Sequence, residues 1–160
     1  NYNYDLLNAT VDFDKKIGNK GDFSLRFKAG KFFNAENISF VDYKHFNGNQ
    51  THVVLDGSYM NSFGLLPYYS NSTNDAYFET HIEHNFKGYI MNKIPLLNKL
   101  QWNLIGGFHQ LNIPNMKPYQ EFTLGFDNIG WGKVRFLRID YVRSYQNGYQ
   151  GDGIMFGLKF

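Results

Sequence analysis

Apolar and polar side chains alternate along most of this chain with a period of two residues, which is typical of β-strands. Eight stretches carry the pattern, and turns rich in Gly, Asn and Asp separate them: 4–17, 22–33, 51–60, 75–90, 99–111, 118–129, 133–145 and 151–160. No stretch keeps helical spacing for three turns. The sequence therefore predicts an all-β chain of about eight antiparallel strands, in which 1–160 is either a single β-barrel domain or the C-terminal segment of a barrel.

Alternate positions sort the side chains into two columns. One column is aromatic and aliphatic, with members such as Phe27, Phe108, Phe122 and Leu124. The other column is polar and mixes both signs of charge, and its charged or titratable members are Arg26, Lys28, Glu79, His81, Glu83, Glu121, Asp127, Arg138, Asp140 and Lys159. Each strand is thus expected to separate two different environments on its two faces.

Two architectures produce such columns. In a soluble barrel or sandwich the apolar column is the core, whereas in an outer-membrane barrel it faces lipid and the polar column lines the lumen. The predicted strands match the roughly 9 to 11 residues that cross a membrane at a tilt. Aromatic side chains also concentrate near strand ends, for example at Tyr89, Trp131 and Tyr145, as interfacial girdles require. These features favour an antiparallel transmembrane β-barrel in a bacterial outer membrane.

The last strand supports the same interpretation. Ile154, Phe156, Leu158 and Phe160 form an apolar edge that ends on an aromatic residue. This ending resembles the C-terminal signal that bacterial barrel proteins present to the outer-membrane assembly machinery. The expected partners are therefore outer-membrane lipid, that machinery through the terminal strand, and other outer-membrane or surface proteins.

Composition narrows the function classes. The chain has 160 residues, of which 19% are aromatic, and a formal net charge of +2. So small a charge offers no electrostatic basis for binding nucleic acid. Because the chain has no Cys, it has no disulfide, thiolate metal site or cysteine nucleophile. It opens at Asn1 rather than Met, so a processed or truncated product is expected.

The segment "ETHIEH" at 79–84 is the best candidate for chemistry, because two His and two Glu could ligate a metal. On a strand, however, Glu79, His81 and Glu83 share one face and His84 points to the other. A hydrogen-bonded polar column is the favoured explanation, and a charge-lined pore is the alternative. Without a helical His-Glu-x-x-His motif, a nucleophile elbow or a phosphate loop, we expect no enzyme, no metal and no cofactor.

The loop "NSFGLLPYYSNSTN" at 61–74 carries an apolar group comprising Phe63, Leu65, Leu66, Tyr68 and Tyr69. If the C-terminus lies in the periplasm, counting strands backwards puts this loop outside the cell. It would then either contact a surface partner or fold into the lumen.

The second half of the chain resembles a known family. The stretches "HIEHNFKGYIMNKIPLLNKLQW" at 81–102 and "PYQEFTLGFDNIGWGKVRFLRIDYVRSY" at 118–145, with the final "GLKF", are similar to an uncharacterised family of Bacteroidota outer-membrane proteins. Full-length members carry an N-terminal carboxypeptidase-regulatory-like domain ahead of a C-terminal barrel. The resemblance implies that these residues are the C-terminal strands of a larger barrel of roughly 16 strands, distantly similar to BamA-like assembly factors.

The sequence thus predicts an outer-membrane barrel protein with a structural, transport or assembly-related role. Three alternatives stay open: a complete eight-stranded membrane anchor, a client of the barrel-assembly machinery, and a soluble ligand-binding barrel with the aromatic column inside.

Overall fold

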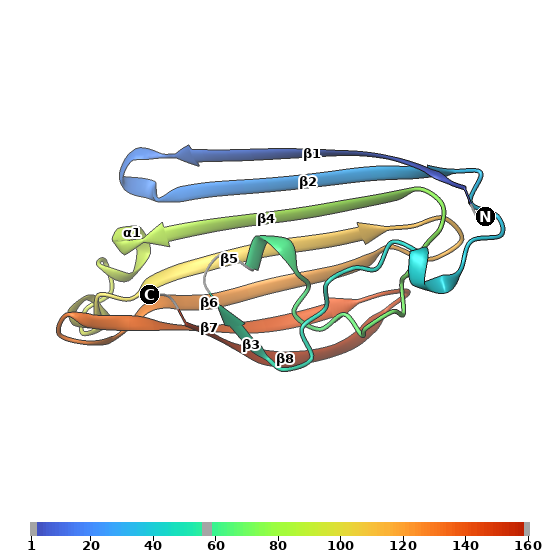
Figure 1. Ribbon diagram of the computed structural model, residues 1–160. Coiled ribbons are helices and arrows are strands. Elements are labelled where there is room, and N and C mark those ends of the chain that lie inside the picture. Colours follow the sequence, from blue (N-terminus) through green and yellow to red (C-terminus); the bar gives the residue numbers. More distant parts are fainter. Residues whose placement is uncertain (1–2, 56–58, 159–160) are drawn as a thin grey trace.

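The computed structural model describes residues 3–55 and 59–158, and most of these residues belong to one mixed but mainly antiparallel sheet (Figure 1). The eight strands follow the sheet order β1-β2-β4-β5-β6-β7-β8-β3. Their bounds are β1 Asp5–Lys16, β2 Asp22–Phe33, β3 Val53–Leu55, β4 Tyr77–Lys87, β5 Asn103–Asn112, β6 Tyr119–Trp131, β7 Val134–Tyr145 and β8 Tyr149–Leu158. The predicted all-β class is therefore confirmed.

Helical structure is confined to short turns. Helix α1 spans Gly88–Met91, and single 3-10 turns lie at Gly18–Lys20, Phe40–Asp42, Tyr59–Asn61 and Leu97–Leu100. Within the described residues, no helix is long and apolar enough to cross a membrane.

Seven long strands form an antiparallel meander, and their connections alternate between two ends of the sheet. The connections 17–21, 88–102 and 132–133 lie at one end, which we call the turn end, and β8 runs toward it (Figure 1). The connections 34–76, 113–118 and 146–148 lie at the opposite end. Since β2 pairs directly with β4, the alternation holds along the whole chain.

The short third strand predicted over 51–60 is present, with narrower bounds. Among the described residues of this stretch the strand is Val53–Leu55, and it pairs in parallel with β8 through Val53↔Phe156 and Leu55↔Leu158. Three residues are too few to cross a bilayer. Alternation over so short a stretch predicts an extended backbone but not its neighbour, and here the neighbour is the far edge of the sheet.

The sheet does not close into a barrel within the described residues. β1 is one edge strand and pairs with β2, and the edge of β8 carries only the short β3. The pairing of the first strand with the last, which the alternative of a complete eight-stranded barrel requires, is therefore not found among these residues. Lys159 and Phe160, predicted for the last strand, lie outside the described residues.

The two faces of the sheet differ in what covers them. Segment 34–76, which includes β3, crosses one face in front of the strands (Figure 1). We call this the covered face and the opposite one the open face. Phe63 and Leu66 of the segment pack on the covered face in one cluster with Tyr77, Leu111 and Tyr119. The apolar core thus forms between the sheet and its longest connection.

Substitution of Gly125 in β6 tests how closely β6 and β7 approach each other on the covered face. A methyl group there would overlap the backbone oxygen of Ile139 and Oδ1 of Asp140. We expect Gly125→Ala to lower the free energy of unfolding by about 1–3 kcal/mol, measured by urea titration. Gly151→Ala is the matched control, because a methyl group at Gly151 meets nothing within 4 Å. Equal stability of the two variants would contradict this packing.

Candidate functional site

Segment 34–76 supplies an aromatic anchor to the centre of the covered face. The side chain of Phe63 is fully buried, and its ring centroid lies 4.8 Å from that of His81 and 5.7 Å from that of Tyr119. Tyr68 and Tyr69 further along the segment stay exposed. The sequence left two alternatives for the apolar loop, contact with a surface partner or folding inward. Phe63 and Leu66 fold inward onto the sheet.

The carboxylate of Glu121 fixes the backbone beside this anchor. Its two oxygens accept hydrogen bonds from the amides of Gly64 and Leu65, both at 2.7 Å, and Tyr119 Oη donates a third at 2.6 Å. Glu121 has no exposed surface. A buried carboxylate is costly unless donors surround it, so the segment and the strand stabilise each other here.

Two histidines continue the polar array toward β4. His81 Nδ1 lies 2.7 Å from His109 Nδ1, and His81 Nε2 lies 2.7 Å from Glu79 Oε1. Two facing ring nitrogens form a hydrogen bond only when one carries the proton and the other does not. With His81 Nε2 donating to Glu79, one of the two facing Nδ1 atoms donates to the other. The three groups form one buried hydrogen-bonded chain.

Arg138 holds the second group of charges. Its guanidinium donates to both oxygens of Glu83 at 2.7 and 3.1 Å, and to both oxygens of Asp140 at 2.7 and 3.0 Å. The ring of Tyr59, from segment 34–76, lies over the guanidinium with its centroid 3.7 Å from Cζ. Such bidentate and stacked contacts use the planar fork of Arg, which Lys could not replace.

The polar array extends to the first two strands. Arg26 pairs with Asp12 of β1, and Arg26 and Lys28 both donate to the side-chain oxygen of Asn61 in segment 34–76. Lys28 Nζ also lies 3.7 Å from Glu79 Oε1. Positive charge from β2 thus balances the carboxylate of β4.

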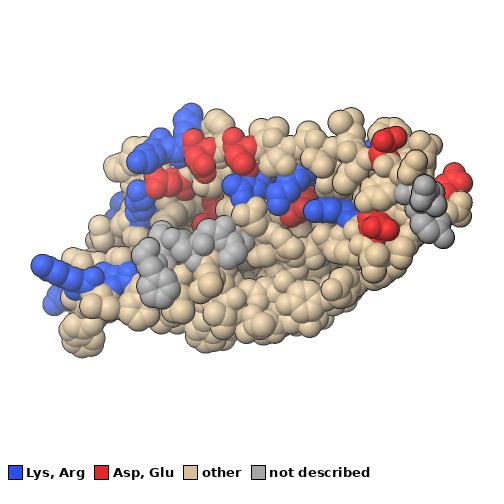
Figure 2. All heavy atoms as spheres, in the orientation of Figure 1, with Lys and Arg blue, Asp and Glu red and all other residues tan. Residues whose placement is uncertain are grey.

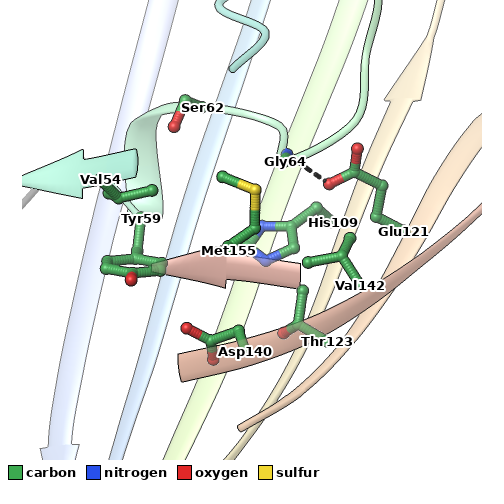
Figure 3. Close-up of a pocket in the computed structure, with 10 residues that line it drawn as sticks. All are labelled: Val54, Tyr59, Ser62, Gly64, His109, Glu121, Thr123, Asp140, Val142 and Met155. Atoms are coloured by element: carbon green, nitrogen blue, oxygen red, sulfur yellow. Dashed lines mark hydrogen bonds between the residues drawn. The ribbon is translucent and has the colours of Figure 1, made fainter. Parts of the chain in front are cut away.

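A small cavity lies between the segment and strands β5–β8 (Figure 3). It offers about 20 Å³, room for roughly one water molecule. Its lining comprises Val54, Tyr59, Ser62, Gly64, His109, Glu121, Thr123, Asp140, Val142 and Met155. Tyr59 Oη and Thr123 Oγ1 are buried without a hydrogen-bond partner among the described residues. No solute larger than water fits this space unless segment 34–76 moves.

The phenol of Tyr59 stays protonated in this site. Burial raises the pKa of Tyr59 well above its ordinary value, and the negative charge of Asp140 raises it further. The ring therefore contacts Arg138 as a neutral aromatic, and the positive charge of Arg138 is balanced by Glu83 and Asp140.

The residues of the predicted polar column lie together on the covered face. Glu79, His81, Glu121, Asp127, Arg138 and Asp140 are buried there, whereas Arg26, Lys28 and Glu83 are partly exposed. Lys159 falls outside the described residues. Ile154 and Phe156 of the predicted assembly signal are exposed on the open face and Leu158 is partly exposed, while Phe160 lies beyond the described residues. Phe156–Leu158 carries β3 on its edge.

Sequence reasoning missed His109 and Tyr119 as parts of this site. His109 shares a face of its strand with the apolar Ile105 and Leu111. The residues of this strand therefore do not form a polar column that would single out His109. Its partner His81 is 28 residues away. The pairing of the two strands would have been the only available signal.

The described residues contain no group of three or more His, Asp or Glu side chains that could hold a metal ion. The site is therefore a closed network of ion pairs and hydrogen bonds around an aromatic anchor.

Fold and site define an all-β protein with an open, mainly antiparallel sheet and a charged face closed by one long connection. A model of the C-terminal domain of a family of unknown function, DUF5686, matches residues 1–126. The chain belongs to this family. No curated protein and no solved structure matches it significantly.

Glu121 tests how segment 34–76 is held. Glu121→Gln replaces one acceptor oxygen by an NH₂ group that faces an amide donor, so one charge-assisted hydrogen bond is lost. We expect this to cost about 2 kcal/mol, which speeds amide hydrogen exchange at Gly64 and Leu65 roughly 30-fold. Glu36→Gln, at an exposed site in the same segment, serves as the control. Unchanged exchange in Glu121→Gln would show that other contacts hold the segment.

Proposed function

We propose that this chain forms part of an outer-membrane β-barrel whose interior is the covered face and whose lipid-facing surface is the open face. Its role is structural, transport-related or assembly-related, and it has no catalytic activity of its own. Segment 34–76 then acts as an internal plug.

The observation that carries the proposal is the inverted burial of neighbouring residues on one strand. Glu121 of β6 has no exposed surface, whereas Phe122 next to it is 50% exposed and Leu124 is 57% exposed. A soluble sheet would bury the apolar side chains and hydrate the charged ones. A membrane barrel reverses this arrangement, because lipid surrounds it and polar groups satisfy one another inside.

Strand length supports the same proposal. The seven long strands have 10 to 13 residues, which is the length that spans the hydrocarbon at a tilt. The soluble ligand-binding alternative needs the aromatic column enclosed, and large side chains of that column, such as Phe78 and Phe156, are exposed instead.

The contacts of segment 34–76 favour a closed resting state. Phe63, the Glu121 hydrogen bonds and the stacking of Tyr59 on Arg138 fasten the segment at three points. Passage of a solute along the covered face would require these contacts to break. A structural role needs no such movement.

Substitution of Leu124 tests whether the open face contacts lipid. Leu124→Arg puts a charge near the middle of β6, and in a bilayer it should cost about 2–4 kcal/mol. We expect a smaller fraction of folded, heat-modifiable protein on unboiled gels after refolding into lipid vesicles. Val41→Arg, at an exposed site in segment 34–76, is the control and should refold as the unchanged protein does. If Leu124→Arg folds equally well, or if the protein is soluble without detergent, the open face does not contact lipid.

We extend the proposal to the architecture: strands outside these 160 residues complete a larger barrel, of roughly 16 strands, and the assembly machinery recognises the last strand. The free edge of β1, twelve residues long, supports this, because an unpaired edge cannot face hydrocarbon. A complete eight-stranded anchor is the alternative. It requires β1 to pair with β8.

Cysteine pairs separate these two architectures, because the chain has no native Cys. Val11→Cys in β1 is combined in turn with Cys at Asp152, Ile154 or Phe156 of β8, and a short thiol cross-linker is added to the protein in membranes. We expect no intramolecular cross-link. Tyr141→Cys with Ile154→Cys, which are register partners, is the positive control. Efficient cross-linking of Val11 to any β8 position would establish the complete small barrel.

A further inference from the structure

A second pocket lies at the turn end, on the opposite side of the sheet from segment 34–76. It has a volume of about 310 Å³ and is lined by Lys99, Leu100, Trp102, Gly130, Trp131, Gly132 and Arg135. The connection 88–102 and the β6–β7 turn form its walls. None of the contacts that close the covered face involves these residues, so the pocket is separate from the polar network.

Arg135 is held rigidly at this pocket by three backbone carbonyl oxygens. Its Nε donates to the backbone oxygen of Gly132 at 3.1 Å, and its Nη1 donates to those of Leu100 and Asn128 at 2.8 and 3.1 Å. The ion pairs among the described residues include neither Arg135 nor Lys99. A fixed guanidinium with spare donors, beside the ammonium of Lys99, is a site suited to a phosphate.

The aromatic walls connect the pocket to the open face. Trp131 is 92% exposed, and the ring of Trp102 lies 5.7 Å from that of Phe126 between centroids. Phe126 belongs to the same apolar column as Phe122 and Leu124. Trp side chains favour the boundary between hydrocarbon and headgroups. The pocket therefore lies where the apolar surface gives way to polar turns.

The turn end as a whole is basic. Residues 14–22, 85–104 and 130–136 together carry eight Lys or Arg and only two acidic residues, although the whole chain has a net charge of only +2. In Figure 2, Lys and Arg side chains are numerous toward this end of the molecule, and others lie across the middle of the visible face. A negatively charged surface next to this end would be attracted to it.

We propose that the turn-end pocket binds the phosphate of an anionic phospholipid headgroup, with Arg135 and Lys99 contacting the phosphate and the two Trp rings flanking the uppermost acyl carbons. This inference rests on the proposed membrane location and deepens it. According to this proposal, the turn end lies at a membrane surface that contains anionic phospholipid, and that lipid is a specific partner of the chain.

Tryptophan fluorescence tests the proposal directly, because Trp102 and Trp131 are the only two Trp residues and both line the pocket. The protein is reconstituted in phosphatidylcholine vesicles at constant ionic strength. Increasing fractions of dibrominated phosphatidylglycerol or dibrominated phosphatidylcholine are added as quenchers. We expect half-maximal quenching at a mole fraction of phosphatidylglycerol roughly five-fold lower than that of phosphatidylcholine. One Lys or Arg contact with an anionic lipid is sufficient for a preference of this size.

Lys99→Gln should reduce this preference without touching the fold, and Arg135→Gln should reduce it as well. Lys117→Gln, in the connection at the opposite end of the sheet, is the control and should keep the full preference. Persistence of the preference in both Lys99→Gln and Arg135→Gln would overturn the assignment to this pocket.

The remaining outcomes separate the two proposals. Equal quenching by both lipids overturns the headgroup site and leaves the membrane location standing. Absence of quenching by either lipid overturns the membrane location and the site together. Loss of the preference on addition of inorganic phosphate, with ionic strength held constant, would identify a site for free phosphate and overturn the lipid assignment.

Discussion

The structure depends on how buried charge is neutralised beneath segment 34–76. A carboxylate removed from water is costly unless donors replace the water, and Glu121 receives three of them, two from the segment's own backbone. Arg138 is neutralised in the same way by Glu83 and Asp140 and is covered by Tyr59. The long connection therefore has to lie on the charged face of the sheet.

This constraint determines what the other face must be. Because the strands alternate, every residue that turns a charge toward the segment is followed by one that turns outward. These outward residues are largely aromatic and aliphatic, and many, such as Phe122 and Leu124, keep half their surface exposed. Paired charges on the covered face and exposed apolar side chains on the open face are the basis of the proposed membrane location, because lipid favours apolar groups at a protein surface.

The sequence was sufficient for the strands of the meander and for the separation into two faces. The observed bounds of β2 coincide with the predicted 22–33, and those of β7 differ by one residue from the predicted 133–145. Both features depend on local alternation, which each strand displays by itself. At 51–60 the alternation predicted a short strand, and β3 spans Val53–Leu55 among the described residues there. Its parallel pairing with β8 was not predicted, because nothing local indicates which strand a short extended segment will join.

The sequence by itself determined that the chain is all-β and which charged residues share a face. Only the tertiary structure decided how those residues are paired, that segment 34–76 covers them, and that the described sheet stays open. The contacts responsible join residues far apart in the chain: Gly64 to Glu121 across 57 positions, and His81 to His109 across 28. Period-two patterning specifies the direction of a side chain but not the partner it meets, because the partner depends on strand order and register.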